Sequence, residues 1–274
     1  MGAVGRQLKN IVAKEWKNSF ATVSVILFLT LLPVILAGQA AWIILASAGE
    51  GAGMTEEDLA KVPPVPVEEL VANREALDEL DPLGRMNVFI FMQFPLYLLL
   101  IPCLVANGLS TFSIVEEKQT GTLEPLLAMP VKTSVLLWGK ALAGAIPAVI
   151  ATWVSTGLMF LAVSLFGPGY FGKFFLEPIW LIFFLLLTPL VALLCFALGV
   201  IASSRAQDAK NAQALSLVVI LPILGLITLQ VLGVALFTPL WMLALSGGFG
   251  LAALLLMKAA VALFRRETIL VRWK

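Results

Sequence analysis

The stretch from Ile114 to Lys140, IVEEKQTGTLEPLLAMPVKTSVLLWGK, interrupts two long apolar runs with a polar segment. It places charges, a Gly-Thr pair and two prolines between segments made mostly of aliphatic and aromatic residues. The flanking runs cover residues 87–113 and 134–166, and each exceeds the roughly 20 residues that a helix needs to cross a bilayer. We therefore interpret the interruption as an aqueous loop between two membrane-spanning helices.

The composition extends this interpretation to the whole chain. Of its 274 residues, 60% are hydrophobic and 13% are charged, and the mean hydropathy is +0.99, whereas soluble domains carry about 25% charged residues. The sequence predicts an all-α polytopic membrane protein, with residues 1–274 forming one transmembrane domain. Thr238 and Pro239 alone separate the last two runs, so a re-entrant piece near 246–250 is an alternative to a sixth full span. The six apolar runs are 20–46, 87–113, 134–166, 179–202, 214–237 and 240–264.

Basic residues indicate the orientation of the spans. Lysine and arginine gather before the first span, around the loop 115–133, after the fourth span and at the C-terminus. Because cytoplasmic loops carry the excess of basic residues, both termini are expected to be cytoplasmic. The opposite side carries only Lys61, Arg74, Arg85 and Lys173.

The segment 6–20 has the pattern of an amphipathic interfacial helix. Its apolar residues recur at helical spacing on one face, and its basic residues lie opposite. Glu15 falls near the apolar side, which is a local conflict. The helix is expected either to anchor to anionic headgroups or to dock on another subunit, and the two roles are compatible. The apolar stripe consists of Leu8, Ile11, Val12, Trp16 and Phe20.

Segment 47–86 is the large external loop that this topology predicts, and it is acidic. Thr55 is expected to cap a short helix, and 63–66 is expected to be extended. Apolar residues between Val67 and Leu80 indicate an amphipathic helix that ends at Pro82. We interpret the segment as a small external cap, with a cation-attracting funnel or a partner dock as the alternative.

Several kinds of chemistry are missing from the sequence. The chain has no histidine, and Cys103 and Cys195 lie inside apolar runs as small hydrophobic residues, so we expect neither catalytic residues nor a metal site. Residues 245–250, LSGGFG, resemble an ATPase signature, but no phosphate-binding loop accompanies them, so the chain is not expected to be an enzyme. The span interiors carry no charged residues, if Lys140 and Lys258 reach the cytoplasmic surface with their long side chains.

The opening loop encodes a short helix of its own. The preceding span is expected to continue to Lys118 or Gln119, with Gly121 ending it in a left-handed conformation. Thr122 then caps a new helix with Glu124 in its first turn, and Pro130 closes it. Such a short helix is not stable alone in water, so it needs a surface to fold against, either lipid headgroups or a partner's groove.

These residues resemble a known family. The stretch Glu117–Val131, EKQTGTLEPLLAMPV, is similar to the pattern E-x-x-x-G-T-[LM]-E-x-L-L-x-x-P of the permease subunits of type-2 ABC transporters, the ABC-2 family. The basic N-terminal helix, six spans, cytoplasmic ends and large first external segment extend the resemblance over the chain.

The resemblance implies a half-transporter that pairs with a second permease copy, as a homodimer or a heterodimer, and engages a cytoplasmic ATPase subunit. ATP and Mg²⁺ would be bound by that ATPase, and no cofactor by this chain; lipids would surround the pair, and no nucleic acid would bind. The implied location is the plasma (inner) membrane of a prokaryote. Implied connecting-helix residues are Leu8, Ile11, Val12, Glu15 and Trp16. Implied coupling residues are Glu116, Glu117, Gly121, Thr122, Leu123, Glu124, Leu126, Leu127, Met129 and Pro130.

Uncharged polar residues within the spans are candidates for lining a transport path, although each is also suited to hydrogen bonding between helices. A path without fixed charges favours export of an apolar or amphiphilic compound. The alternatives are an ATP-coupled exporter of an ion such as sodium, an ion channel or ion-driven carrier, and a membrane scaffold without transport. The candidate path residues are Gln39, Gln93, Asn107, Thr152, Ser155 and Thr156.

Overall fold

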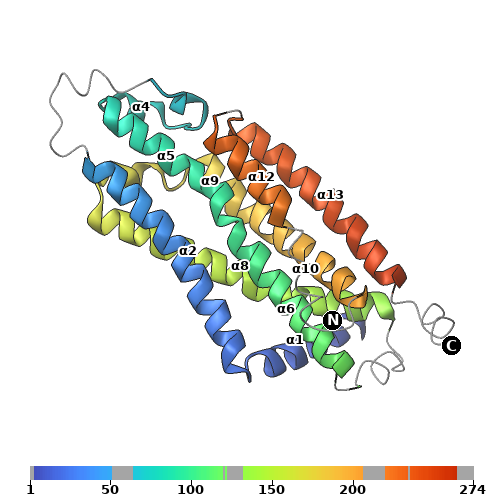
Figure 1. The fold of residues 1–274 in the computed structure, drawn as a ribbon. Helices are drawn as coiled ribbons and strands as arrows, with labels where there is room; N and C mark the ends of the chain where they lie inside the picture. Colours follow the sequence, from blue (N-terminus) through green and yellow to red (C-terminus); the bar gives the residue numbers. More distant parts are fainter. Residues whose placement is uncertain are drawn as a thin grey trace.

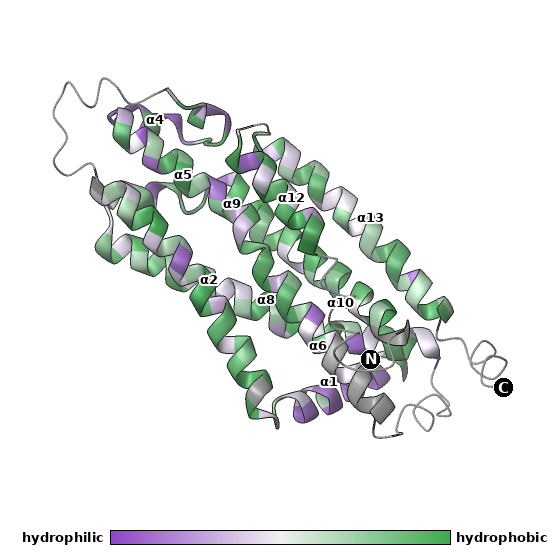
Figure 2. Ribbon diagram, in the orientation of Figure 1, coloured by the Kyte–Doolittle hydropathy of each residue, from purple (hydrophilic) through white to green (hydrophobic). Residues whose placement is uncertain are grey.

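The structure is a computed structural model that describes residues 3–50, 64–119, 121, 132–205, 220–233 and 235–263. Within these ranges every regular element is helical, as predicted, and the long helices lie side by side in one bundle (Figure 1). Hydrophobic residues cover the long helices, whereas hydrophilic residues concentrate in α1 and α4 at opposite ends (Figure 2). The elements are α1 (Ala3–Ser19), α2 (Val23–Glu50), η2 (Val67–Glu69), α4 (Arg74–Asp78), α5 (Pro82–Leu98), α6 (Leu100–Gln119), α8 (Thr133–Phe166), η3 (Gly169–Phe174), α9 (Pro178–Ile182), η4 (Phe183–Leu187), α10 (Thr188–Arg205), α12 (Ile220–Val231) and α13 (Pro239–Leu263).

Five helical stretches are long and apolar enough to cross a membrane. The fifth of the six predicted runs is represented by α12, which has 12 residues and a length of about 18 Å, short of the roughly 30 Å of a hydrocarbon core. Residues 206–219 of that region lie outside the described residues. The count of six spans therefore stays a prediction. The five stretches are Val25–Gly49, Pro82–Ser110, Thr133–Phe166, Pro178–Ala202 and Pro239–Leu263.

The re-entrant alternative for the last run is wrong. Helix α13 continues without a break from Pro239 to Leu263, so the small residues of 246–250 lie inside a regular helix. Within them Gly250 packs against Leu190 of α10, at ordinary van der Waals distance from where a side chain would begin. This glycine serves close helix packing, as small residues commonly do between membrane helices.

Helices α6 and α10 form the centre of the bundle. They make the most extensive helix pair, and Gly199 of α10 lies so close to Ser110 and Asn107 of α6 that a methyl group there would overlap them. Toward the end that carries α4, the core is aromatic: Phe160 stacks on Phe175 with ring centroids 4.4 Å apart, and both Phe160 and Phe91 pack on the buried Trp180. Large buried rings thus fill the half of the bundle nearest the cap.

One span contains a π-helical turn, η4, between α9 and α10. The Thr188 hydroxyl donates to the carbonyl of Phe183 at 2.8 Å, five residues back. The indole Nε1 of Trp153, on α8, donates to the carbonyl of Phe184 at 3.2 Å. Since a π turn leaves carbonyls poorly matched to the regular helical pattern, these two side chains satisfy acceptors within it.

The external cap differs from its prediction. Instead of one amphipathic helix ended by Pro82, the chain forms the short turn η2 and the five-residue α4, and Pro82 begins α5. The Asp81 side chain accepts the Gly84 N–H at 2.8 Å, and proline is well suited to the first position of a helix because it has no N–H to satisfy. The predicted apolar residues are nevertheless buried: Val67, Leu70, Val71 and Leu77 are at most 4% exposed.

A buried carboxylate holds the cap to the bundle. Glu177, just before α9, is 4% exposed and accepts the backbone N–H groups of Ala72 and Asn73 at 2.6 and 3.1 Å. Asn73 in turn caps α4 by accepting the Ala76 N–H at 3.2 Å. Lys173 and Glu79 form an exposed ion pair across the same junction. Glu177 therefore fixes the break between η2 and α4 against the start of the fourth span.

Candidate functional site

Helix α1 crosses the foot of the bundle, where α6 ends and α8 begins (Figure 1). The face predicted to be apolar is the one turned inward: Glu15 is buried, and the other members of the predicted set are partly buried. Ile11 packs on Gly139 of α8 so closely that a Cβ at Gly139 would lie 2.8 Å from Ile11 Cγ2. The glycine therefore allows the two helices to approach. The partly buried members are Leu8, Ile11, Val12 and Trp16.

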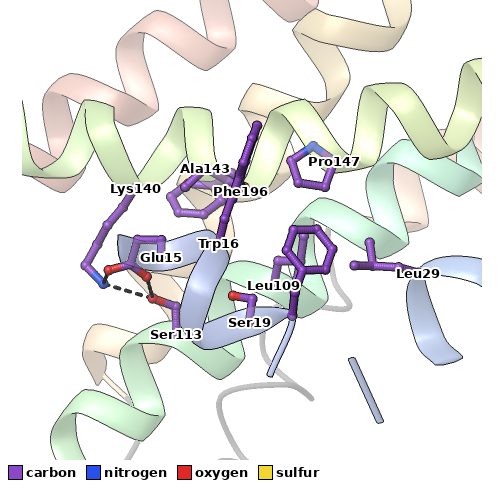
Figure 3. Close-up of a pocket in the computed structure, with 12 residues that line it drawn as sticks. Glu15, Trp16, Ser19, Leu29, Leu109, Ser113, Lys140, Ala143, Pro147 and Phe196 are labelled. Carbon is purple, nitrogen blue, oxygen red and sulfur yellow. Dashed lines mark hydrogen bonds and ion pairs between the residues drawn. The ribbon is translucent and has the colours of Figure 1, made fainter. Parts of the chain in front are cut away.

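The indole of Trp16 fixes α1 to a defined point on α8. Its Nε1 donates to the backbone carbonyl of Ala143 at 2.9 Å. Pro147 lies four residues further along α8 and has no N–H to donate to that carbonyl. Trp16 therefore satisfies an acceptor that the proline leaves without its helical partner (Figure 3).

Glu15 joins a buried polar cluster with Lys140 and Ser113, shown in Figure 3. The Lys140 ammonium lies 3.1 Å from Glu15 Oε1 and donates to Ser113 Oγ at 2.8 Å, and the Ser113 hydroxyl donates to Glu15 Oε2 at 2.9 Å. Lys140 is 3% exposed and Glu15 is 8% exposed. Lys14 lies at 4.0 Å from Glu15 on the outer side.

The expectation that Lys140 extends to the membrane surface is therefore wrong. Lys140 points toward α1, because a carboxylate and a hydroxyl there replace the water that a surface position would supply. The same pair resolves the conflict at Glu15, whose acidic side chain faces the apolar side in order to meet a buried cation. A charged pair in such surroundings persists only with good geometry and further hydrogen bonds, and Ser113 supplies those bonds.

The cluster ties together three elements at the loop quoted first. Ser113 lies near the end of α6, Lys140 lies in the second turn of α8, and the loop 120–132 connects these two helices. Gly121 follows α6 with φ of +67°, which confirms the predicted left-handed stop after Gln119. Glu15 brings α1 to the same point. Movement of the loop would thus act on α6, α8 and α1 together.

Most predicted coupling residues lie outside the described residues. Glu116 and Glu117 are in the last turn of α6, where the structure describes the backbone only. Their contribution to a contact stays a prediction. The coupling residues outside the described ranges are Thr122, Leu123, Glu124, Leu126, Leu127, Met129 and Pro130.

The candidate path residues do not converge on one cavity. The Gln39 side chain accepts the Tyr97 hydroxyl at 2.9 Å, joining α2 to α5, and Gln93 receives the side-chain amide of Gln230 from α12. The hydroxyls of Thr152 and Ser155 donate to carbonyls of their own helix.

Two further candidates are buried without a hydrogen-bond partner for one oxygen each, within the described residues. They are Asn107 on α6, through Oδ1, and Thr156 on α8, through Oγ1. A role in lining a path stays a prediction for all six residues.

Sequence reasoning missed the partners of Glu15. Ser113 and Lys140 are 98 and 125 residues away along the chain, and the carbonyl of Ala143 carries no side-chain signal. The misplaced acidic residue on the apolar face of segment 6–20 was the one local sign that a buried cation had to be found elsewhere. Pro147 was a second sign, since a proline inside a helix leaves a carbonyl to satisfy.

Comparison with protein families gives one match. The family model described as an ABC-2 family transporter protein matches residues 9–261, a range that includes nearly all of α1 and every long helix through most of α13. Comparison with curated proteins gives no match. The matched range contains the whole polar cluster and the loop between α6 and α8.

Proposed function

Because the chain belongs to the ABC-2 family of transporter proteins, we propose that this membrane transport component is the permease subunit of an ATP-driven exporter. Its partner is a separate cytoplasmic ATPase subunit that binds ATP and Mg²⁺, and the chain itself binds no cofactor. A second permease copy, identical or homologous, completes the path. The location is the plasma (inner) membrane of a prokaryote, with both termini in the cytoplasm.

One observation carries the coupling part of the proposal. The buried cluster of Glu15, Ser113 and Lys140 joins α1 to both helices that flank the loop 120–132. In the proposed mechanism, ATP draws two ATPase subunits together and their movement displaces the loop. Because the cluster links the three helices at that end, α6, α8 and α1 shift together, and the path between the two permease copies opens outward.

The proposed substrate is an apolar or amphiphilic compound. Among the described residues, the buried ion pair lies at one end of α8, and the candidate residues further along the spans are amides and hydroxyls. A bare ion crossing the middle of the bundle would find few fixed charges to compensate it. The ranked alternatives are an ATP-coupled exporter of an ion such as sodium, and a scaffold without transport.

Leu126→Asp tests the coupling proposal. If Leu126 docks in a groove of the ATPase, an unpaired carboxylate buried there costs several kcal/mol. We expect loss of ATPase co-purification and of substrate-stimulated hydrolysis, with normal membrane insertion. Ala206→Asp, in the loop after the fourth span, is the matched control. Full assembly and coupled hydrolysis in the Leu126 variant would refute the proposed role of this loop.

Thiol labelling tests the orientation. In sealed cells, cysteines introduced at Glu57 and Glu75 should react with an impermeant reagent, and cysteines at Lys118 and Arg266 should not. The native Cys103 and Cys195 are buried and give a low background. Labelling of the second pair from outside would reverse the topology and remove the loop from the side of the ATPase.

Reconstitution with the cognate ATPase tests the substrate class. Lipophilic compounds should stimulate hydrolysis, and Na⁺ and other simple ions should not. ATP-dependent ion flux without stimulation by any lipophilic compound would favour the ion exporter instead.

A further inference from the structure

An apolar groove of about 370 Å³ runs between α2 and α8 and ends at α1. Its walls include Pro33 and Val34 of α2 and Ile150 and Val154 of α8, and Phe20, just after α1, closes one end. The volume falls within the range of roughly 300–1,000 Å³ that is typical of small-molecule sites. The groove opens along the side of the bundle, at the depth of the apolar spans (Figure 2).

Two prolines explain why the helices leave this space. Pro33 and Pro147 each lie inside a helix and line the groove, and a proline inside a helix removes a backbone hydrogen bond and kinks the helix. Val34, Ile150 and Val154 consequently remain 49%, 51% and 57% exposed, although Leu29 beneath them is 8% exposed. The groove thus has a packed floor and open apolar walls.

The polar groups of the groove are already used. The Thr30 hydroxyl donates to the Ile26 carbonyl at 2.9 Å, and the Ser155 hydroxyl donates to the Thr152 carbonyl at 3.1 Å. Neither hydroxyl hydrogen is available to orient a polar molecule. The fitting occupant for this part of the site is therefore a hydrocarbon chain.

The charge at the closed end selects the headgroup. Helix α1 carries four basic residues and one carboxylate, and that carboxylate, Glu15, is directed inward to Lys140. Lys17, in the last turn of α1, is exposed and lies in sequence between the groove-lining aromatics Trp16 and Phe20. Basic side chains beside the bilayer surface attract anionic lipids, each contributing about 1 kcal/mol.

We propose that this groove binds one acyl chain of an anionic phospholipid of the cytoplasmic leaflet, whose phosphate is held by the basic side chains of α1. The choice of leaflet rests on the orientation in the proposed function. The site itself uses no residue of the loop to the ATPase. A bound lipid would bridge α2, α8 and α1 at the place where α1 is fixed to the bundle.

Native mass spectrometry of the purified chain, with neither ATPase nor nucleotide, tests the proposal apart from coupling. The probes are phosphatidylglycerol and phosphatidylcholine with identical acyl chains. We expect at least fivefold greater retention of phosphatidylglycerol by the unmodified protein. Val154→Trp, which fills the groove, should remove most of this retention, whereas Leu251→Trp on the exposed face of α13 should leave it unchanged. Lys17→Gln should reduce the preference for phosphatidylglycerol about fivefold, since it removes one lysine.

Ile150→Trp provides a second groove-filling variant if Val154→Trp does not fold, as judged by size-exclusion chromatography. Equal retention of the two lipids by the unmodified protein would overturn the proposal. Equal phosphatidylglycerol retention by the groove-filling variants and Leu251→Trp would overturn it as well. Loss of ATPase coupling with intact lipid selectivity would contradict the proposed function and leave this site standing.

Discussion

Two buried carboxylates, at opposite ends of the bundle, hold peripheral segments to the spans in different ways. Glu15 pairs with the side chains of Lys140 and Ser113 and fixes α1. Glu177 accepts two backbone N–H groups, from Ala72 and Asn73, and fixes the cap. Both side chains are less than 9% exposed.

The difference concerns what each carboxylate leaves behind when it moves. Separation of Glu15 from Lys140 would leave two opposite charges without partners in apolar surroundings, so α1 and α8 are expected to move as one unit. Separation of Glu177 from the cap would leave one charge and two backbone groups near the water side, which water can satisfy. The α1 end is thus suited to transmit movement, and the cap end to release it.

The largest expected effect is that of Lys140→Met. It removes the cation and leaves the Glu15 carboxylate buried, which typically costs about 3–5 kcal/mol. We expect a strongly lowered melting temperature in detergent and loss of coupling between hydrolysis and transport. Lys258→Met, on an exposed position of α13, should have little effect. The double variant Glu15→Gln with Lys140→Met should recover most of the stability, and no recovery would show that the pair does not act as a unit.

Glu177→Gln should have the next largest effect, but only on the cap. The amide keeps one acceptor oxygen and loses the charge, so about 1.5–3 kcal/mol of charge-assisted hydrogen bonding is at stake. Amide hydrogen exchange at residues 67–78 should accelerate severalfold, with no change in α1. The exposed Glu69→Gln serves as the control. Faster exchange in α1 as well would show that the two ends are not independent.

Gly139→Ala probes the packing beside the polar cluster. The added methyl group would meet Ile11 at Cγ2 and Cβ, and because Ile11 is branched at Cβ it cannot easily move away. Overpacking of this kind typically costs about 1–3 kcal/mol. We expect weaker attachment of α1, measured as faster proteolysis within residues 3–19. Gly157→Ala on the same helix, where nothing lies within 4 Å of the new Cβ, should be neutral or slightly stabilising.

Ser113→Ala should have the smallest effect at the α1 end. The Glu15 to Lys140 contact persists, and the loss is one hydroxyl that makes two hydrogen bonds, worth about 1 kcal/mol each at most in net terms. The melting temperature should fall slightly, and coupling should be retained. Ser47→Ala, at the far end of α2, is a matched serine that bonds within its own helix. Full loss of coupling in Ser113→Ala would mean that the hydroxyl, rather than the ion pair, transmits the movement.

Features determined by local chemistry were predictable from the sequence. The end of α6 at Gln119 and the positive φ of Gly121 follow from glycine's tolerance of left-handed geometry. The boundaries of α8 and α13 agree with the predicted apolar runs to within a residue. The amphipathic face of α1 was also correct.

Features determined by distant contacts or by ambiguous residues were not. Proline both follows helix ends and begins helices, and at Pro82 the capping side chain of Asp81 decided for a beginning. Lys140 resembles a lysine that reaches the surface until its partner, 125 residues earlier, is placed beside it. Glu177 is one glutamate among many in the sequence, and only the fold brings the backbone of Ala72 to it.

The π turn η4 has a consequence for the rotational register of the fourth span. Such a turn contains one residue more than the regular helical path. Deletion of one residue from 183–187 would restore regular geometry and rotate all of α10 by about 100° about its own axis, since a helix has 3.6 residues per turn. Gly199 would then turn away from Ser110, and Cys195 would leave the core. A single inserted residue therefore orients the central helix of the bundle.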